Sequence, residues 1–230
     1  MRLTDVLPSM ESLLPQADLG YVLITRLLEP DRSLKAFSAD LEQAHRDKDS
    51  DANIFLQPRD TVRVFGINQS RGPSLAPILE RLRRQKRYGQ PADIVSIEGH
   101  VYSPGGYPFQ DGMTLGQLIK AASGVMPEAV LDYGILIREI DAQGTIKSIS
   151  FSLDSYVNKS TPQNELTLQP HDRVFVFAKE ANRAKRLESI LLRLNQQART
   201  DMPAQIVQVG GLVRFPGLYP LTASMKISDL

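Results

Sequence analysis

The chain has no cysteine, no long apolar run and almost no net charge. Without cysteine it forms no disulfide, holds no thiolate-bound zinc and offers no cysteine nucleophile. No stretch reaches the roughly 20 apolar residues that a membrane-spanning helix needs. A formal net charge of +1 gives no reason to expect nucleic-acid binding. The lack of thiols suits an oxidising compartment, although many cytosolic chains lack cysteine too.

Groups typical of metal sites and active sites are also scarce. The three histidines, His45, His100 and His171, are scattered and show no metal-ligand spacing. The sequence contains no Ser–His–Asp candidate, no glycine-rich phosphate loop and no repeated pair of carboxylates suited to acid–base chemistry. We therefore expect no catalytic residue, no metal and no cofactor.

What the sequence does contain is an internal repeat. Residues 94–108 alternate apolar and polar positions, then pass through Pro104-Gly105 to an aromatic residue, which predicts a strand, a tight turn and a second strand. A similar stretch, residues 206–220, follows 112 residues later. The likeness continues beyond this hairpin, so the chain is predicted to be built from repeated units.

The repeat also suggests where the chain was cut. Met1-Arg2-Leu3 corresponds to Met113-Thr114-Leu115 and to Met225-Lys226-Ile227, so the sequence begins and ends partway through a unit. We interpret it as a piece of a longer protein, whose signal peptide, lipid anchor or membrane segment this sequence cannot reveal.

Hydrophobic and charged contents of 42% and 23% are ordinary for a folded chain. The repeat divides the 230 residues into five segments. These are a partial unit without its opening hairpin (1–66), a connector (67–93), a complete unit (94–178), a second connector (179–205) and the opening hairpin of a further unit (206–230).

Hydrophobic periodicity assigns elements to these segments. A helix is expected over Leu3–Leu14, interrupted at Pro8, and a charged loop over residues 45–52. In the complete unit we expect the order ββ-α-ββ plus a closing strand, a two-layer α+β arrangement of the β-grasp kind. Each connector carries an amphipathic helix that we expect to dock on the units. The apolar stripes of the two connectors are Leu75, Ile78, Leu79 and Leu82, and Leu187, Ile190, Leu191 and Leu194.

Three motifs carry a resemblance to a known family. The first is an apolar residue followed by x-G-x-V-x-x-P-G-x-Y, at 97–107 and again at 209–219. The second is a Met-Thr-Leu helix start with a helix ending in glycine, at 113–124. The third is L-x-P-x-D-x-V-x-V, at 56–64 and 168–176. Together they resemble tandem SLBB repeats, the soluble-ligand-binding β-grasp (ubiquitin-like) fold, typical of polysaccharide export proteins of the Wza type.

The sequence departs from this family at one point. The closing motif of the family usually has glycine before its aspartate, where this chain has Arg59 and His171. We therefore expect the turn to avoid positive φ here.

Several residues are candidates for glycan contact. Tyr107 and Tyr219 could stack on a sugar ring or pack within the sheet. Arg26 and Arg138 end equivalent strands and could bind an anionic polymer or form an ion pair. Pro104 and Gly105 could form a binding loop or serve the turn alone.

A basic run in the first connector is the strongest charge feature. It could meet an acidic polysaccharide or form a solvated helix face. Its members are Arg81, Arg83, Arg84, Lys86 and Arg87.

The resemblance implies a non-enzymatic module in the periplasm, with a parent protein associated with the outer membrane. Its implied partners are a polysaccharide, which the basic run allows to be acidic, and other subunits of an export complex. A protein-interaction or oligomerisation scaffold without glycan contact is the alternative, and a carbohydrate-active enzyme is a third reading.

The two incomplete units predict an assembly. Residues 1–66 lack an opening hairpin and residues 206–230 supply one, so each would leave a strand edge exposed. We expect the halves to combine, in a homo-oligomer with strands swapped between neighbouring chains rather than by folding back within one chain.

Overall fold

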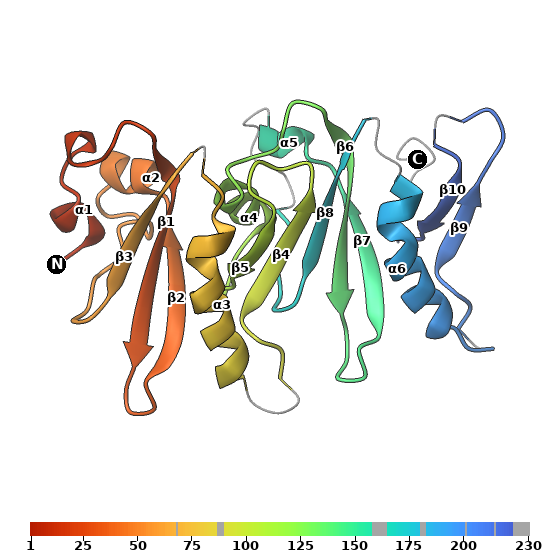
Figure 1. Ribbon diagram of the computed structural model, residues 1–230, viewed down its shortest axis with the longest axis horizontal. Coiled ribbons are helices and arrows are strands. Elements are labelled where there is room, and N and C mark those ends of the chain that lie inside the picture. Colours follow the sequence, from red (N-terminus) through yellow and green to blue (C-terminus); the bar gives the residue numbers. More distant parts are fainter. Residues whose placement is uncertain are drawn as a thin grey trace.

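The computed structural model shows a mixed α+β chain with three small sheets arranged in a row (Figure 1). It describes residues 1–67, 69–86, 90–157, 165–179, 183–200, 202–213 and 215–222. The predicted loop at 158–164, Arg87 and the last residues of the C-terminal segment lie outside the described residues.

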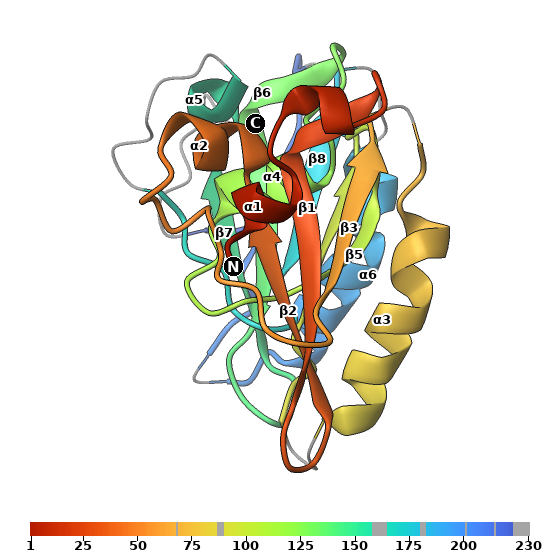
Figure 2. The same ribbon diagram turned by 90° about the vertical axis from the view of Figure 1, so that its left-hand side faces the viewer.

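The first unit holds a three-stranded antiparallel sheet in the order β2-β1-β3. Its elements are α1 (Leu3–Val6), a 3₁₀ turn (Met10–Ser12), β1 (Ala17–Leu28), β2 (Ser33–Ala39), α2 (Leu41–Arg46) and β3 (Thr61–Gly66). One face of this sheet packs on α1 and α2 through Leu3, Val22, Ile24 and Leu41. Figure 2, which looks from this end of the molecule, shows α3 (Gly72–Gln85) to one side.

The central unit holds a mixed five-stranded sheet in the order β5-β4-β8-β6-β7, in which β4 and β8 run parallel. Its elements are β4 (Ile94–Gly99), β5 (Gly105–Pro108), α4 (Leu115–Ala121), β6 (Ala129–Glu139), β7 (Ile146–Phe151), α5 (Asp154–Val157) and β8 (Arg173–Ala178). Thr114 caps α4, where its side chain and that of Gln117 bond each other's backbone N–H. A helix against a mixed sheet is consistent with the β-grasp fold.

The strand register repeats along the chain. Val22 pairs with Ala39 between β1 and β2, and Gly134 pairs with Phe151, 112 residues later, between β6 and β7. The interruption between Ala17 and Val22 also recurs, between Ala129 and Gly134. The repeat in the sequence is thus a repeat of backbone pairing.

The connector helices are docked, as predicted. Leu75 and Leu82 of α3 are almost fully buried, as are Leu187 and Leu194 of α6 (Arg183–Gln196). The core around α3 contains Tyr21 from the first sheet together with residues of the central unit. The core around α6 joins the central sheet to the C-terminal hairpin of β9 (Ile206–Val209) and β10 (Gly217–Pro220). Sheets and helices therefore alternate along the row as packed layers.

Three sequence predictions need correction here. The helix expected over Leu3–Leu14 covers only Leu3–Val6, because Pro8 cannot continue it and the residue before a proline avoids the helical region. Part of the expected loop at 45–52 belongs to the short helix α2, whose N-cap Asp40 accepts the Gln43 N–H. The helix α5 was not predicted, because it spans only four residues.

The turn before the closing strand was also predicted wrongly. Arg59 and His171 do adopt positive φ, at 70° and 68°. The left-handed region costs a non-glycine residue about 1–2 kcal/mol. The turn accepts this cost because a carboxylate fixes it: Asp60 accepts the Gln57 N–H at 2.8 Å, and Asp172 accepts the Gln169 N–H at 2.7 Å.

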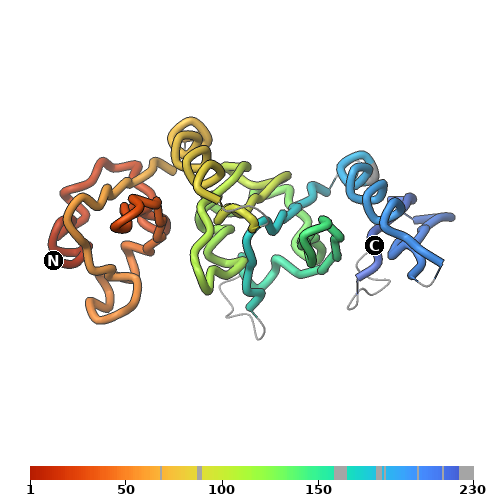
Figure 3. The backbone as a smooth tube through the Cα atoms, turned by 90° about the horizontal axis from the view of Figure 1, so that it is seen from below, coloured from red at the N-terminus to blue at the C-terminus, as the bar shows by residue number. Residues whose placement is uncertain are grey.

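The two incomplete units lie at opposite ends of the row (Figure 3). Closure by folding back within one chain therefore does not occur. Pairing between neighbouring chains stays a prediction.

Candidate functional site

The two arginines predicted to touch a glycan are engaged inside the fold. Arg26 donates to both carboxylate oxygens of Asp60, at 2.9 and 2.7 Å, and to the Phe55 carbonyl at 2.8 Å. The Arg26 and Asp60 side chains are only 12% and 3% exposed. Burial by itself would raise the pKa of Asp60, but the hydrogen bonds from Arg26 and the Gln57 N–H outweigh burial and lower it.

The second copy of this pair has the same geometry. Arg138 donates to Asp172 at 2.9 and 2.6 Å and to the Thr167 carbonyl at 2.9 Å. Because these donors are already paired in the interior, the prediction that Arg26 and Arg138 bind an anionic polymer is not supported. The alternative of an ion pair describes both, although the pairs are buried rather than on the surface.

The prediction of sugar stacking on Tyr107 and Tyr219 is wrong. Both side chains are 1% exposed, so neither ring face is open to a ligand. The Tyr107 hydroxyl donates to the Ser103 carbonyl at 2.6 Å, and the Tyr219 hydroxyl donates to the Phe215 carbonyl at 2.7 Å. Each tyrosine thus closes its own hairpin loop, which agrees with the packing alternative.

Pro104 and Gly105 lie in the turn between β4 and β5, where Gly105 has a φ of 145°. A Cβ added to Gly105 would meet no other atom, so this glycine is required by the backbone and not by a close neighbour. The structure brings no second binding group to this turn.

The basic run is only partly free. Arg81 donates to the Arg32 carbonyl at 2.9 Å, and Arg84 donates to Glu80 at 2.9 Å on the same helix. Arg83 also faces Glu80, at 3.9 Å. Lys86 is exposed beside a cavity of about 270 Å³. The described members of the run therefore form a solvated helix face with internal ion pairs.

The largest hollow described in the structure is a cleft of about 790 Å³ where the first and central units meet, here named the junction cleft. The first unit contributes α2 with Asp40 and Gln43, and the central unit contributes α4 with Gln117 and Lys120. Lys120 Nζ reaches across to Asp40 Oδ2 at 2.8 Å and ties the two walls together. Its lining is Asp18, Gly20, Asp40, Glu42, Gln43, Arg46, Ile67, Thr114, Gly116, Gln117, Ile119, Lys120, Ser123, Gly124, Ser155, Tyr156 and Glu165.

A buried arginine fixes the floor of this cleft. Arg71 is 1% exposed and bonds Asp18 of β1 and the Ala121 carbonyl of α4. Its guanidinium lies 5.0 Å from the Tyr21 ring centroid and 5.2 Å from that of Phe65. Because one side chain holds both units, their relative position at the cleft is fixed by the interior and not by a flexible linker.

The walls of the junction cleft carry the groups that bind sugars. Carboxylates, amides and hydroxyls can each exchange hydrogen bonds with sugar hydroxyls. Tyr156 adds an aromatic wall close to α4, since a Cβ on Gly116 would lie 3.3 Å from its ring. Sequence reasoning missed this site because its residues come from two units and share no motif. A link between α2 and α4 is invisible without the packing of the row.

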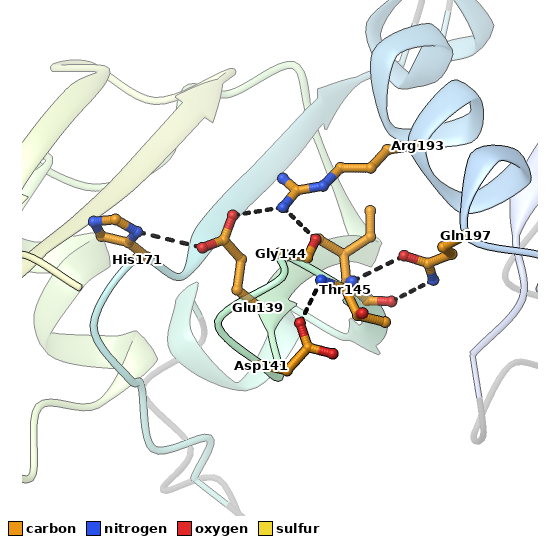
Figure 4. Close-up of polar contacts among 8 residues, drawn as sticks. Glu139, Asp141, Gly144, Thr145, His171, Arg193 and Gln197 are labelled. Atoms are coloured by element: carbon orange, nitrogen blue, oxygen red, sulfur yellow. Dashed lines mark hydrogen bonds and ion pairs between the residues drawn. The ribbon is translucent and has the colours of Figure 1, made fainter. Parts of the chain in front are cut away.

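A second polar cluster joins α6 to the end of the central sheet (Figure 4). Glu139 accepts from Arg193 at 2.7 Å and lies 3.4 Å from His171 Nδ1. Burial alone would raise the pKa of Glu139, but Arg193 and His171 outweigh it and lower the pKa. Because every link joins neighbouring elements, we assign this cluster to the attachment of α6. In the described part of the chain, no group of three or more potential metal ligands is present.

Comparison with known proteins gives one match. No curated protein matches the chain. Among the residues that the structure describes, no helix is both long and apolar enough to cross a membrane. Residues 94–146, from β4 through α4 and β6 to the first residue of β7, match the SLBB domain, which is found in polysaccharide export proteins. The chain therefore contains an SLBB domain at residues 94–146.

Proposed function

We propose that this chain is a non-enzymatic module of a polysaccharide export system, of the capsule, exopolysaccharide or biofilm kind, and that it contacts the glycan, partner subunits or both. The SLBB domain at 94–146 is the observation that carries the proposal. In this proposal the flanking segments are further units of the same kind. The recurrence of strand register 112 residues apart supports this extension.

The proposal places the glycan in the junction cleft. The cleft is open, has room for a few sugar rings and is lined by amides, hydroxyls and carboxylates. Its walls are held by the Lys120–Asp40 bridge and by Arg71 beneath, so the polar groups keep their spacing before a ligand arrives. Such preorganisation lowers the entropic cost of binding.

The periplasm is the proposed compartment, with the parent protein associated with the outer membrane. A chain without cysteine is compatible with that oxidising compartment. The proposal involves no nucleic acid.

Titration with oligosaccharides, followed by backbone NMR shifts, tests glycan contact. Neutral and acidic oligosaccharides should each be tried, and binding should shift amides of α2 and α4 around the cleft. Gln117→Ala and Tyr156→Ala should weaken binding several-fold, whereas Glu188→Gln on the exposed face of α6 should not change it. Shifts that are absent for every glycan, or that persist unchanged in both cleft variants, would reject the glycan site.

The alternative is a protein-interaction or oligomerisation scaffold that touches no glycan. The outer edge of β3 favours it, because no strand pairs there in the described part of the chain. Exposed strand edges recruit extended segments of partners. A carbohydrate-active enzyme would need an acid–base pair. Glycan turnover that survives purification and is abolished by one Asp or Glu substitution would overturn the non-enzymatic proposal.

A further inference from the structure

The central unit shows how an opening hairpin joins a sheet. β4 lies parallel to β8, where the Ser96 N–H bonds the Asp172 carbonyl at 2.9 Å and the His100 N–H bonds the Val176 carbonyl at 2.9 Å. The strands approach so closely that a Cβ on Gly99 would stand 1.9 Å from the Val176 oxygen. The motif glycine is therefore required by the neighbouring strand.

The loop of the same hairpin fills a socket beside β8. Val101 is fully buried and forms a bridge with Val125, in the segment after α4. The Tyr102 N–H bonds the Gly124 carbonyl at 3.2 Å, and the Met126 N–H bonds the His100 carbonyl at 3.0 Å. One valine and a short run of backbone bonds thus anchor the hairpin.

The first unit has the same socket, unfilled. A hollow of about 560 Å³ lies beside β3 and is lined by Leu13, Leu14, Val64 and Phe65, among others. These four residues stand 112 positions before Val125, Met126, Val176 and Phe177. Leu14 is 83% exposed at its rim. No strand pairs with the outer edge of β3 among the residues described.

The C-terminal hairpin already has the shape that would fill this socket. Gly211 has a φ of 88°, close to the 97° of Gly99. The Val213 N–H bonds the Gly211 carbonyl at 2.9 Å, as the Val101 N–H bonds the Gly99 carbonyl at 3.0 Å. The two residues at the loop, Leu212 and Val213, are exposed, at 110% and 41%. Exposed apolar residues on a folded loop are typical of an interaction surface.

We propose that the β9–β10 hairpin of one copy of this chain adds to the free edge of β3 in a second copy. Val213 then enters the hollow beside Leu13 and Val64. The central unit fixes the register by correspondence. The Gln208 N–H bonds the partner's Asp60 carbonyl, the Leu212 N–H bonds the partner's Val64 carbonyl, and the partner's Arg59 N–H bonds the Ile206 carbonyl.

This contact is head-to-tail. The hairpin and the β3 edge lie at opposite ends of the row, so each copy offers one of each and the contact does not close on two copies as a symmetric pair would (Figure 3). Copies add along the row as units do within the chain. The proposal goes beyond glycan contact, because it depends on backbone pairing and one apolar socket only.

Sedimentation velocity of the full chain across a range of concentrations tests the proposal. The wild type should form dimers and longer species as concentration rises. Val213→Asp should lose them, because a carboxylate cannot enter the apolar hollow without a partner. Leu192→Asp makes the same change at an exposed leucine of α6, 58% exposed, and should assemble like the wild type.

Mixing two blocked variants gives the sharper test. Val213→Asp disables the hairpin and keeps the socket, whereas Leu14→Asp places a charge at the rim of the socket and keeps the hairpin. Each alone should be monomeric, and a one-to-one mixture should form a two-chain species and nothing longer. Circular dichroism and melting should show that both variants are folded, since both positions are exposed in the isolated chain.

A wild-type chain that stays monomeric at every concentration would overturn the proposal. So would a Val213→Asp variant that assembles like the wild type, or a mixture of the two blocked variants that contains only monomers.

Discussion

Arg138 grips Asp172 with two hydrogen bonds, of 2.9 and 2.6 Å, and the Asp172 side chain is fully buried. The pair joins β6 to the turn before β8 and holds that turn at a positive φ. The first unit repeats the arrangement with Arg26 and Asp60. The closing motif therefore requires its aspartate for structure, and a distant arginine is its partner.

Removing one partner of this pair should destabilise the central unit strongly. Arg138→Ala leaves a buried carboxylate without its cation, which costs about 3–5 kcal/mol. Asp172→Asn should cost less, because the amide can still accept one hydrogen bond from Arg138 and one from the Gln169 N–H. Urea unfolding of the two single variants and the double variant measures the coupling.

A double-mutant cycle separates the pair from general damage. The coupling between Arg138 and Asp172 should exceed about 1 kcal/mol, since contacting residues in one network show 0.5–3 kcal/mol. Lys147→Ala, at an exposed position beside β6, serves as the control and should couple with neither. Additive single effects would contradict this prediction.

The same pair in the first unit should make stability depend on acid pH. The folded-state pKa of Asp60 is lowered, so its contribution is present above the unfolded-state pKa of about 3.9 and is lost as pH falls through the folded value. Asp60→Asn should therefore be less stable than the wild type at pH 7, and the difference should shrink towards pH 2. Chemical unfolding at several pH values measures it, with the exposed Asp49→Asn as the control. A difference that is the same at all pH values would refute the prediction.

Local patterns in the sequence were sufficient for the order of elements and the docked connectors. The stripe Leu75, Leu79 and Leu82 has helical spacing and cannot be left in water, so its burial follows from the sequence. The hairpins follow from alternation and Pro-Gly turns. These signals are read within a few residues, where backbone geometry and side-chain direction are coupled.

Partnerships between distant residues could not be predicted in this way. Arg26 and Asp60 both stood out in the sequence, but nothing there brings residues 34 positions apart into contact. Tyr107 shows the same limit, because an aromatic residue in a strand looks alike whether its ring is buried or exposed. Arg59 adopts positive φ because Asp60 fixes the turn, and a propensity argument for Arg59 alone gives the opposite answer.

The two connector stripes should differ in their tolerance of charge. Leu79 is 7% exposed, whereas Leu191 is only partly buried against its core. Burial of a leucine contributes roughly 1.5–3 kcal/mol, and each kcal/mol shifts the melting temperature of a chain this size by about 2–4 °C. Leu79→Asp should lower the melting temperature by at least about 5 °C and Leu191→Asp by less. Differential scanning calorimetry measures both, and equal or absent shifts would contradict the docking.

Two glutamines near the ends of the connectors act as strand partners for the sheet edges. Gln197 Oε1 accepts the Ile146 N–H at 2.9 Å, and its Nε2 donates to the Ile146 carbonyl at 2.8 Å. Gln85 makes the same pair of bonds to Leu34, at 2.8 and 2.6 Å. Ile146 is 3% exposed, so losing these bonds leaves buried backbone groups unsatisfied.

Gln197→Ala should therefore speed hydrogen exchange at the Ile146 amide by about tenfold, the effect of losing a bond worth roughly 1–1.5 kcal/mol. Gln197→Glu should leave this amide slower than in the alanine variant, because a carboxylate still accepts from the N–H although it cannot donate to the carbonyl. Gln196→Ala, at the exposed neighbouring position, is the matched control and should leave the Ile146 rate unchanged. Gln85→Ala should produce the same acceleration at Leu34, which makes the clamp a property of the repeat. Equal Ile146 rates in the Gln197→Ala variant and the wild type would show that the side chain does not protect this edge.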